Sequence, residues 1–155
     1  MKIKLVCVGS VRDRNVASLV QGYAARATHY FPFAIDELPD VRSTGDSNQQ
    51  KNTEGQKILS RISANDYLVL FDEKGVELTS RKFAGFIEQK SVTMQGNLIF
   101  VIGGPYGFSD EVYRRSNMKL SLSQMTFPHE LARLVAVEQI YRAATILRGE
   151  PYHHD

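Results

Sequence analysis

The residues best suited to hold a ligand follow a short apolar segment, in the run "LIFVIGGPYGFSDEV" that begins at Leu98. Gly103, Gly104 and Gly107 would let the backbone come unusually close to a bound molecule. If the apolar segment is a strand, these glycines lie at its carboxyl end, where open α/β sheets bind their ligands. Pro105 removes a backbone donor, and neither common glycine-rich phosphate pattern is matched. Two interpretations stay open: a tight structural turn, or a turn that holds a small ligand by backbone and apolar contacts.

A second candidate ligand site is the loop just before a proline-initiated helix. This loop consists of Leu122, Ser123, Gln124, Met125, Thr126 and Phe127. It combines small hydroxyl groups with soft apolar side chains. Such a loop suits a flat, uncharged ring with a sulfur or a ribose attached better than it suits a polyphosphate.

The helix after this loop carries two pairs of polar residues at the i,i+4 spacing that places side chains on one face. The first pair is His129 with Arg133, and the second is Glu138 with Arg142. The second pair is typical of an intrahelical ion pair, but arginines can also contact a phosphate backbone or a cofactor carboxylate. A histidine at a helix start is more often bound by the local backbone than active.

The C-terminal "PYHHD" has no apolar run to anchor it, so it is either a disordered end or a cover for a site. As a cover, Tyr152 could stack on a base, and His153 or His154 could transfer protons near neutral pH. Adjacent histidines rarely chelate one ion together, and no set of residues with metal-ligand spacing supports them. The sequence therefore predicts no metal site.

Alternating strand-like and helix-like segments position these groups. The expected strands are 3–9, 33–38, 67–72, 98–102 and 119–125, and the expected helices are 16–27, 49–63, 80–90, a short helix from Ser109, and 128–148. Residues 73–75 are expected to turn, residues 40–48 to form a mobile surface loop, and Thr79 or Ser80 to cap a helix. The alternation predicts one α/β domain over residues 1–155, with a largely parallel sheet and helices on both faces.

The composition fits a soluble globular protein of 155 residues, with 43% hydrophobic and 23% charged residues. The single cysteine, Cys7, lies in an apolar run, which favours a buried core residue and a reducing cytoplasmic location. No segment resembles a signal peptide or a membrane span, so no membrane partner is expected. A net charge of +2 is compatible with a nucleic-acid partner without requiring one.

The last helix is apolar around most of its circumference, which indicates burial on more than one side. A partner subunit is the simplest cover in so small a domain. The apolar residues are Leu131, Leu134, Val135, Val137, Ile140, Tyr141, Ala144 and Leu147.

Taken together, "VIGGPYG", "LSLSQMTFPHELARLVAVEQIYRA" and the terminal "PYH" closely resemble the bacterial ribosomal large-subunit pseudouridine N3-methyltransferases. These are small members of the SPOUT, or α/β-knot, methyltransferases. The resemblance extends over essentially the whole chain, including "IKLVCVG" and "LVLFDEKG". It implies a C-terminal trefoil knot, although true knots are very rare among protein folds.

The resemblance also implies the ligands and partners. The cofactor would be S-adenosylmethionine, held by Phe71, by Gly103 and Gly104, and by residues 122–127. The enzyme would be a homodimer that methylates a pseudouridine in 23S ribosomal RNA on assembled ribosomes. Family tails commonly carry a basic residue after "YH", whereas this chain has His154 and Asp155. A phosphate contact at that position would be weaker and pH-dependent here.

Methylation of N3 requires a base that takes the N3 proton. Our preferred candidate is His153, with Glu138 and His129 as alternatives. Arg133 and Arg142 would position RNA phosphate or stabilise the uracil anion that develops. Two other classes stay open: a ribosome-associated RNA-binding module without catalysis, and a flavodoxin-like binder of small molecules.

Overall fold

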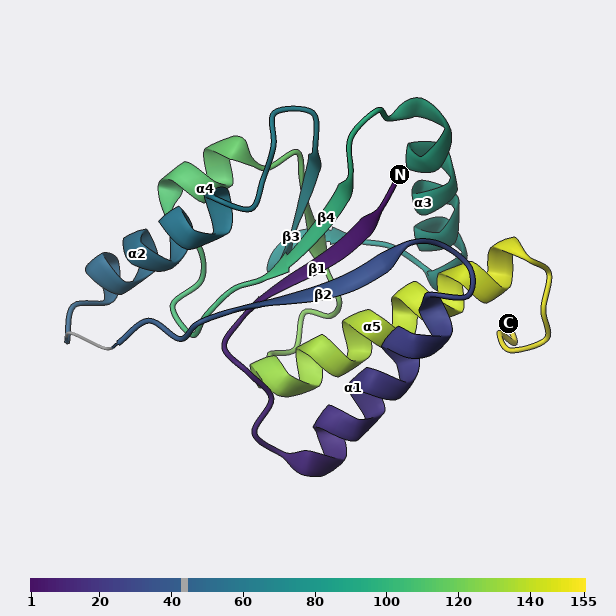
Figure 1. The fold of residues 1–155 in the computed structure, drawn as a ribbon, viewed down its shortest axis with the longest axis horizontal. Coiled ribbons are helices and arrows are strands. Elements are labelled where there is room, and N and C mark those ends of the chain that lie inside the picture. The colour runs from purple at the N-terminus through teal and green to yellow at the C-terminus, as the bar shows by residue number, and fades with distance from the viewer. Residues whose placement is uncertain (43–44) are drawn as a thin grey trace.

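A computed structural model describes residues 1–42 and 45–155. In this part of the chain, five parallel strands form one sheet in the order β2-β1-β4-β3-β5 (Figure 1). The strands are β1 (Ile3–Val8), β2 (Phe33–Leu38), β3 (Tyr67–Glu77), β4 (Leu98–Ile102) and β5 (Met118–Ser121). The predicted parallel sheet is confirmed, and the carboxyl ends of its strands share one edge. The strand order alone does not test the trefoil knot, so the knot stays a prediction.

Helices cover both faces of the sheet, as predicted (Figure 1). They are α1 (Arg14–Ala27), α2 (Ser47–Leu59), α3 (Ser80–Thr93), α4 (Asp110–Arg115) and α5 (His129–Leu147). Helices α1, α3 and α5 lie on one face, and α2 and α4 lie on the other. Thr79 and Ser109 cap α3 and α4, because their side chains accept backbone N–H groups of the first turn. No described helix has both the length and the apolar character that crossing a membrane requires.

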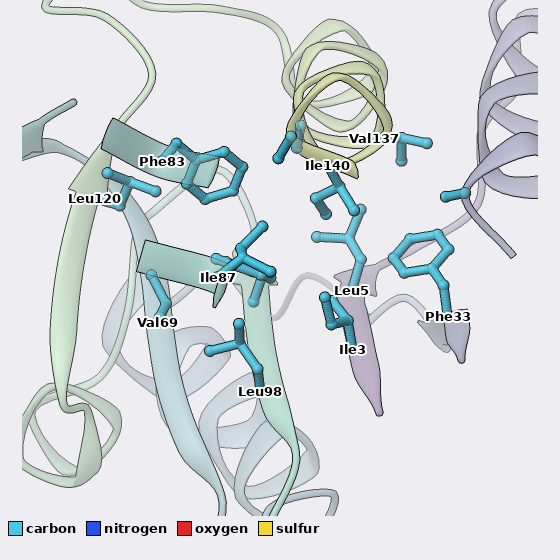
Figure 2. Packing of buried hydrophobic residues seen from close by; sticks show 14 of the residues in the cluster. Ile3, Leu5, Phe33, Val69, Phe83, Ile87, Leu98, Leu120, Val137 and Ile140 are labelled. Carbon is cyan, nitrogen blue, oxygen red and sulfur yellow. The ribbon is translucent and has the colours of Figure 1, made fainter. Parts of the chain in front are cut away.

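The core lies in two layers because side chains alternate along each strand. In β4, Phe100 packs toward α3 and α5, whereas Val101 packs toward α2 and α4. Figure 2 shows the larger layer, where Leu5 of β1 and Ile140 of α5 approach one another. Cys7 belongs to this layer and is fully buried, and burial raises the pKa of its thiol to about 12. The prediction of a buried core cysteine is confirmed.

Three elements differ from the sequence prediction by more than three residues at one end: α2, β3, and β5, which ends at Ser121 rather than at residue 125. Helix α2 begins two residues earlier, because the Asp46 side chain accepts the N–H groups of Asn48 and Gln49, and it ends at Leu59. Strand β3 does not end at Asp72 but continues to Glu77, with a shift of register against β5. The residues between Phe71 and Val76 form an irregular bulge within the strand, rather than a turn that ends it. Ser43 and Thr44, in the middle of the predicted surface loop, lie outside the described residues.

Neighbouring elements of the same chain cover much of the apolar circumference of helix α5. It packs against the sheet and between α1 and α3 (Figure 1). Ile140 and Val137 are completely buried there, so neither is available to a second subunit. Leu131 and Leu147, at opposite ends of the helix, are 44% and 37% exposed. The apolar pattern alone therefore does not require a partner subunit, and the homodimer stays a prediction.

Candidate functional site

A cavity of about 440 Å³ lies at the carboxyl edge of the sheet. Its walls are the β3 bulge from Phe71 to Lys74, the glycine turn from Ile102 to Phe108, and the loop before α5. The predicted cofactor residues that line it are Phe71, Gly103, Gly104, Leu122, Ser123, Met125, Thr126 and Phe127. Gln124 is absent from the lining and is exposed. Segments far apart in the sequence thus meet around one space, and the assignment of these residues to a cofactor stays a prediction.

The two cavity-lining glycines of this turn pack closely against other parts of the chain. A Cβ atom on Gly103 would lie 2.8 Å from Cε1 of Phe108, whose ring is buried. A Cβ atom on Gly104 would lie 2.5 Å from a carboxylate oxygen of Glu54. Both glycines are therefore required by close packing within the chain, whatever the cavity binds.

Gly103→Val is expected to destabilise the fold by about 1–3 kcal/mol, because the larger side chain overpacks the space that Phe108 fills. Denaturant unfolding measures this loss. Gly85→Ala, at a helical glycine with no heavy atom within 4 Å of the added Cβ, is the matched control and should not destabilise the protein. An unchanged unfolding midpoint for Gly103→Val would contradict the packing described here.

Glu54 of α2 is a candidate site residue that the sequence analysis missed. Its side chain is buried behind the glycine turn, with the whole residue only 3% exposed. Gln50 donates from Nε2 to Glu54 Oε1 at 3.3 Å. Burial raises the pKa of Glu54, and the negative charge of Asp40 adds to this effect, while Gln50, the Gly104 amide and His129 oppose it. The available signal was the i,i+4 spacing of Gln50, Glu54 and Ile58, which places all three on the inner face of α2.

Glu54→Gln is expected to gain stability relative to the wild type as pH rises. Because the folded pKa lies above the ordinary value of 4.5, the folded chain binds more protons than the unfolded chain in the window between the two. The contribution of Glu54 to stability is therefore fully present below that window and is lost as pH rises through the folded pKa. Glutamine does not titrate, so the difference in Tm between variant and wild type should shift in the variant's favour from about pH 4 to about pH 7. A difference that stays constant with pH would contradict this.

Side-chain hydrogen bonds join the β3 bulge to the loop before α5 and to α4. Thr126 Oγ1 donates to Glu73 Oε2 at 2.9 Å, which links the loop before α5 to the β3 bulge. Beside it, Tyr113 Oη donates to Asp72 Oδ2 at 2.5 Å, and burial together with this bond raises the pKa of Tyr113 to about 12. Burial opposes ionisation of Asp72, but the bonds from Tyr113 and the Lys74 N–H give its carboxyl a net lowered pKa. The β3 bulge thus presents an ionised carboxylate to the cavity.

The first polar pair of α5 is divided between two environments. His129 lines the cavity, whereas Arg133 does not. Arg133 is 3% exposed, forms an ion pair with Glu37 at 2.5 Å, and donates to the Gly9 carbonyl at 2.8 Å. These contacts attach α5 to the ends of β1 and β2. Arg133 thus has partners within the chain, and its contact with RNA stays a prediction.

The second polar pair of α5 forms the intrahelical ion pair, with Arg142 to Glu138 at 2.6 Å. The C-terminal tail packs onto this pair. Tyr152 Oη donates to Glu138 Oε1 at 2.9 Å, and His153 Nδ1 lies 3.1 Å from Arg142. Arg81 of α3 bonds Asp155 at 2.6 Å, so the hypothesis of a disordered end is wrong. His154 is exposed.

The tail and the cavity lie at opposite ends of α5. His129, at the first turn, lines the cavity, and the tail folds back at the other end. Nineteen helical residues separate the two ends by roughly 28 Å at about 1.5 Å of rise per residue. One chain therefore does not bring His153 to its own cavity. Among the described residues, no group of three or more histidine, cysteine or acidic side chains is placed to hold a metal ion.

Comparison with known proteins places the chain among methyltransferases. A family model described as "Predicted SPOUT methyltransferase" matches residues 1–153. The chain is 48% identical to ribosomal RNA large subunit methyltransferase H of Christiangramia forsetii, with 99% of each chain covered. It is 46% identical to the protein of the same name from Parabacteroides distasonis, with both chains covered completely.

Solved structures share the fold at low sequence identity. A Legionella pneumophila protein that was solved with S-adenosylmethionine bound aligns with a TM-score of 0.51 and 16% identity. The alignment covers 92% of this chain and 66% of that one. At this identity the likeness concerns the fold alone.

Proposed function

Because this chain belongs to the SPOUT methyltransferase family, we propose that it transfers the methyl group of S-adenosylmethionine to N3 of a pseudouridine in 23S ribosomal RNA. The family predicted from the sequence motifs is confirmed, and the chain is a large-subunit ribosomal RNA methyltransferase. The observation that carries the finer proposal is the cavity. It joins three loops that the resemblance assigned to the cofactor, in a chain that matches its relatives from end to end.

The residues around the cavity fit S-adenosylmethionine. Phe71, Ile102 and Leu122 supply apolar surface for a ring, and the loop before α5 supplies backbone polar groups and small hydroxyls. Asp72 and Glu73 supply negative charge for a cationic ligand. When bound, the cofactor supplies a methyl group on a positively charged sulfur, which is ready for in-line displacement. The chain itself has to hold this group and align a nucleophile with it.

A base has to take the N3 proton of the substrate, and two histidines are candidates. His129 lies in the cavity wall of the same chain. His153 lies at the far end of α5 and is held by Arg142 and Asp155. Glu138 is the weaker candidate, because one of its oxygens accepts from Arg142 and Tyr152 and the other accepts from Gln139. We propose that Glu138 holds the C-terminal tail in position through its bond from Tyr152.

For His153 to act, its tail must reach the cavity of a second copy of the chain. We therefore propose a homodimer in which each cavity is completed by the partner's tail. Closed two-fold symmetry would place the same contact at both sites. Tyr152 would stack on the exposed base, His153 would take the proton, and Arg142 would stabilise the anion that develops. His154 would contact RNA phosphate, and the enzyme would act where assembled ribosomes are, in the cytoplasm.

Methylation of isolated ribosomes tests the reaction. Ribosomes that lack the methyl mark are incubated with the protein and isotopically labelled S-adenosylmethionine, and the 23S RNA is digested and analysed by mass spectrometry. We expect one labelled nucleoside, N3-methylpseudouridine. Ribosomes in which that pseudouridine is left as uridine are the matched control and should gain no label at this position.

The other outcomes separate the alternatives. Binding to ribosomes without any transfer of label would support an RNA-binding module without catalysis. Label on another nucleotide would keep the methyltransferase and overturn the proposed target. Transfer to free RNA at the same rate as to ribosomes would overturn the requirement for assembled particles.

A further inference from the structure

We propose that Glu54 is a positioning residue for the cofactor, because its carboxylate holds the backbone of the glycine turn at the wall of the cavity. This inference rests on the proposed function, since it takes the cavity to be the cofactor site. Glu54 itself does not line the cavity. It would act through Gly104, whose backbone separates the carboxylate from the cavity.

Burial and close packing indicate this role. Charged carboxylates are almost never fully buried unless they are paired, yet Glu54 is 3% exposed and forms no ion pair among the described residues. Its two oxygens lie 2.5 and 2.6 Å from the position that a Cβ atom on Gly104 would occupy. A side chain at 104 is thus excluded by the carboxylate, and the turn is closed by the Gly107 N–H, which donates to the Gly104 carbonyl at 3.2 Å.

The carboxylate is itself held in place. Gln50 donates to it from one turn earlier on α2. Helix α2 is fixed against α4 at the next residue, where a Cβ atom on Gly55 would lie 2.4 Å from Ser109 Oγ. The position of Gly104 therefore depends on a rigid contact between α2 and α4. A preformed contact of this kind lowers the free-energy cost of ordering the glycine turn when a ligand binds.

Removing the carboxylate should weaken cofactor binding without changing the chemical step. For Glu54→Ala we expect the Kd for S-adenosylmethionine, measured by calorimetry, to rise about tenfold, because the glycine turn loses the side chain that it packs against and has to be ordered on binding. We expect kcat on ribosomes at saturating cofactor to stay within about twofold. The substitution should weaken binding of the ground state and of the transition state equally, which leaves the barrier between them unchanged. Glu54→Gln keeps an acceptor oxygen of the same reach and should restore the Kd to within about threefold of the wild type.

Asp66 provides the matched control. It is also a buried carboxylate, 7% exposed, and it accepts the N–H groups of Ser63 and Asn97 at the opposite edge of the sheet. Asp66→Asn should lower the Tm without changing the Kd for S-adenosylmethionine. If Glu54→Ala does not fold, Glu54→Asp tests the same role, because the shorter side chain keeps the negative charge but holds the carboxylate further from Gly104. It should show the same rise in Kd.

Three results would overturn the role of Glu54. These are a folded Glu54→Ala or Glu54→Asp variant with wild-type affinity, an equal loss of affinity in Asp66→Asn, and a fall in kcat with unchanged Kd. A wild-type protein that does not bind S-adenosylmethionine in the same calorimeter would instead overturn the proposed function. The two failures are therefore distinguishable.

Discussion

Deletion of Tyr152–Asp155 is expected to slow methyl transfer to ribosomes by about a hundredfold or more, while S-adenosylmethionine still binds with wild-type affinity. The tail lies far from the cavity of its own chain, so its removal leaves that cavity intact. The deletion removes the Tyr152 bond to Glu138, the contact of His153 with Arg142 and the exposed Arg81–Asp155 ion pair, and it should lower the free energy of unfolding by about 1–3 kcal/mol. Single-turnover methylation and calorimetry measure the two effects separately.

Two further variants assign the effect within the tail. His153→Ala should account for most of the loss if His153 is the base, and His154→Ala for little of it. Arg81→Ala is the matched control, because it breaks the exposed ion pair to Asp155 and leaves Tyr152 and His153 in place. A deletion variant that methylates at the wild-type rate would move the search for a base to His129.

Leu122→Arg is expected to weaken binding of S-adenosylmethionine by roughly a hundredfold, which corresponds to about 2.8 kcal/mol. Leu122 lies half-buried in the cavity wall, and an arginine there would fill space and repel a cationic ligand. The rate of methylation at low cofactor concentration should fall by a similar factor. Leu78→Arg is the control, because Leu78 is equally half-buried and lines only the smaller neighbouring pocket that Leu122 also borders. Equal affinity for the two variants would place the cofactor elsewhere.

Co-expression of the Leu122→Arg and His153→Ala chains tests whether the site is shared between subunits. At low cofactor concentration, each variant alone should be nearly inactive. In a mixed dimer, one cavity and the tail that reaches it are both intact, so the random mixture should regain about a quarter of wild-type activity. If each tail served its own cavity, no site in the mixture would be complete, and activity would stay absent.

Most of the fold could be predicted because it depends on local patterns. Apolar runs of strand length and helical periodicity located every element of the sheet and its covering helices. The extension of β3 could not be predicted in this way. Its polar "DEKG" is typical of a turn, and only pairing of Val76 and Glu77 with β5 keeps these residues in the sheet. That pairing depends on residues far along the chain.

The sequence predicted those site residues that directly follow a strand. It did not predict the residue that packs behind the site from a helix. The glycine turn and the loop before α5 follow β4 and β5 directly. Glu54 lies in the polar run "SNQQKNTEGQKIL", where its spacing from Gln50 and Ile58 indicates one face of α2 but does not indicate that Gly104 packs against that face. Spacing likewise placed His129 and Arg133 on one face, but it could not indicate that a neighbouring strand end would bind the arginine.

The strand order has a consequence for the synthesis of the chain. Strand β1 is made first, yet it pairs with both β2 and β4, and the helix that covers its inner face is made last. A nascent chain therefore carries an unpaired apolar strand edge until residue 102 has emerged, and a sheet face that α1 and α3 cover only in part until α5 follows. Folding must wait for nearly complete translation, as is common for parallel sheets with non-local pairing. Chains that stop before α5 would present Leu5 and Phe100 to chaperones and proteases, so α5 makes folding depend on a complete chain.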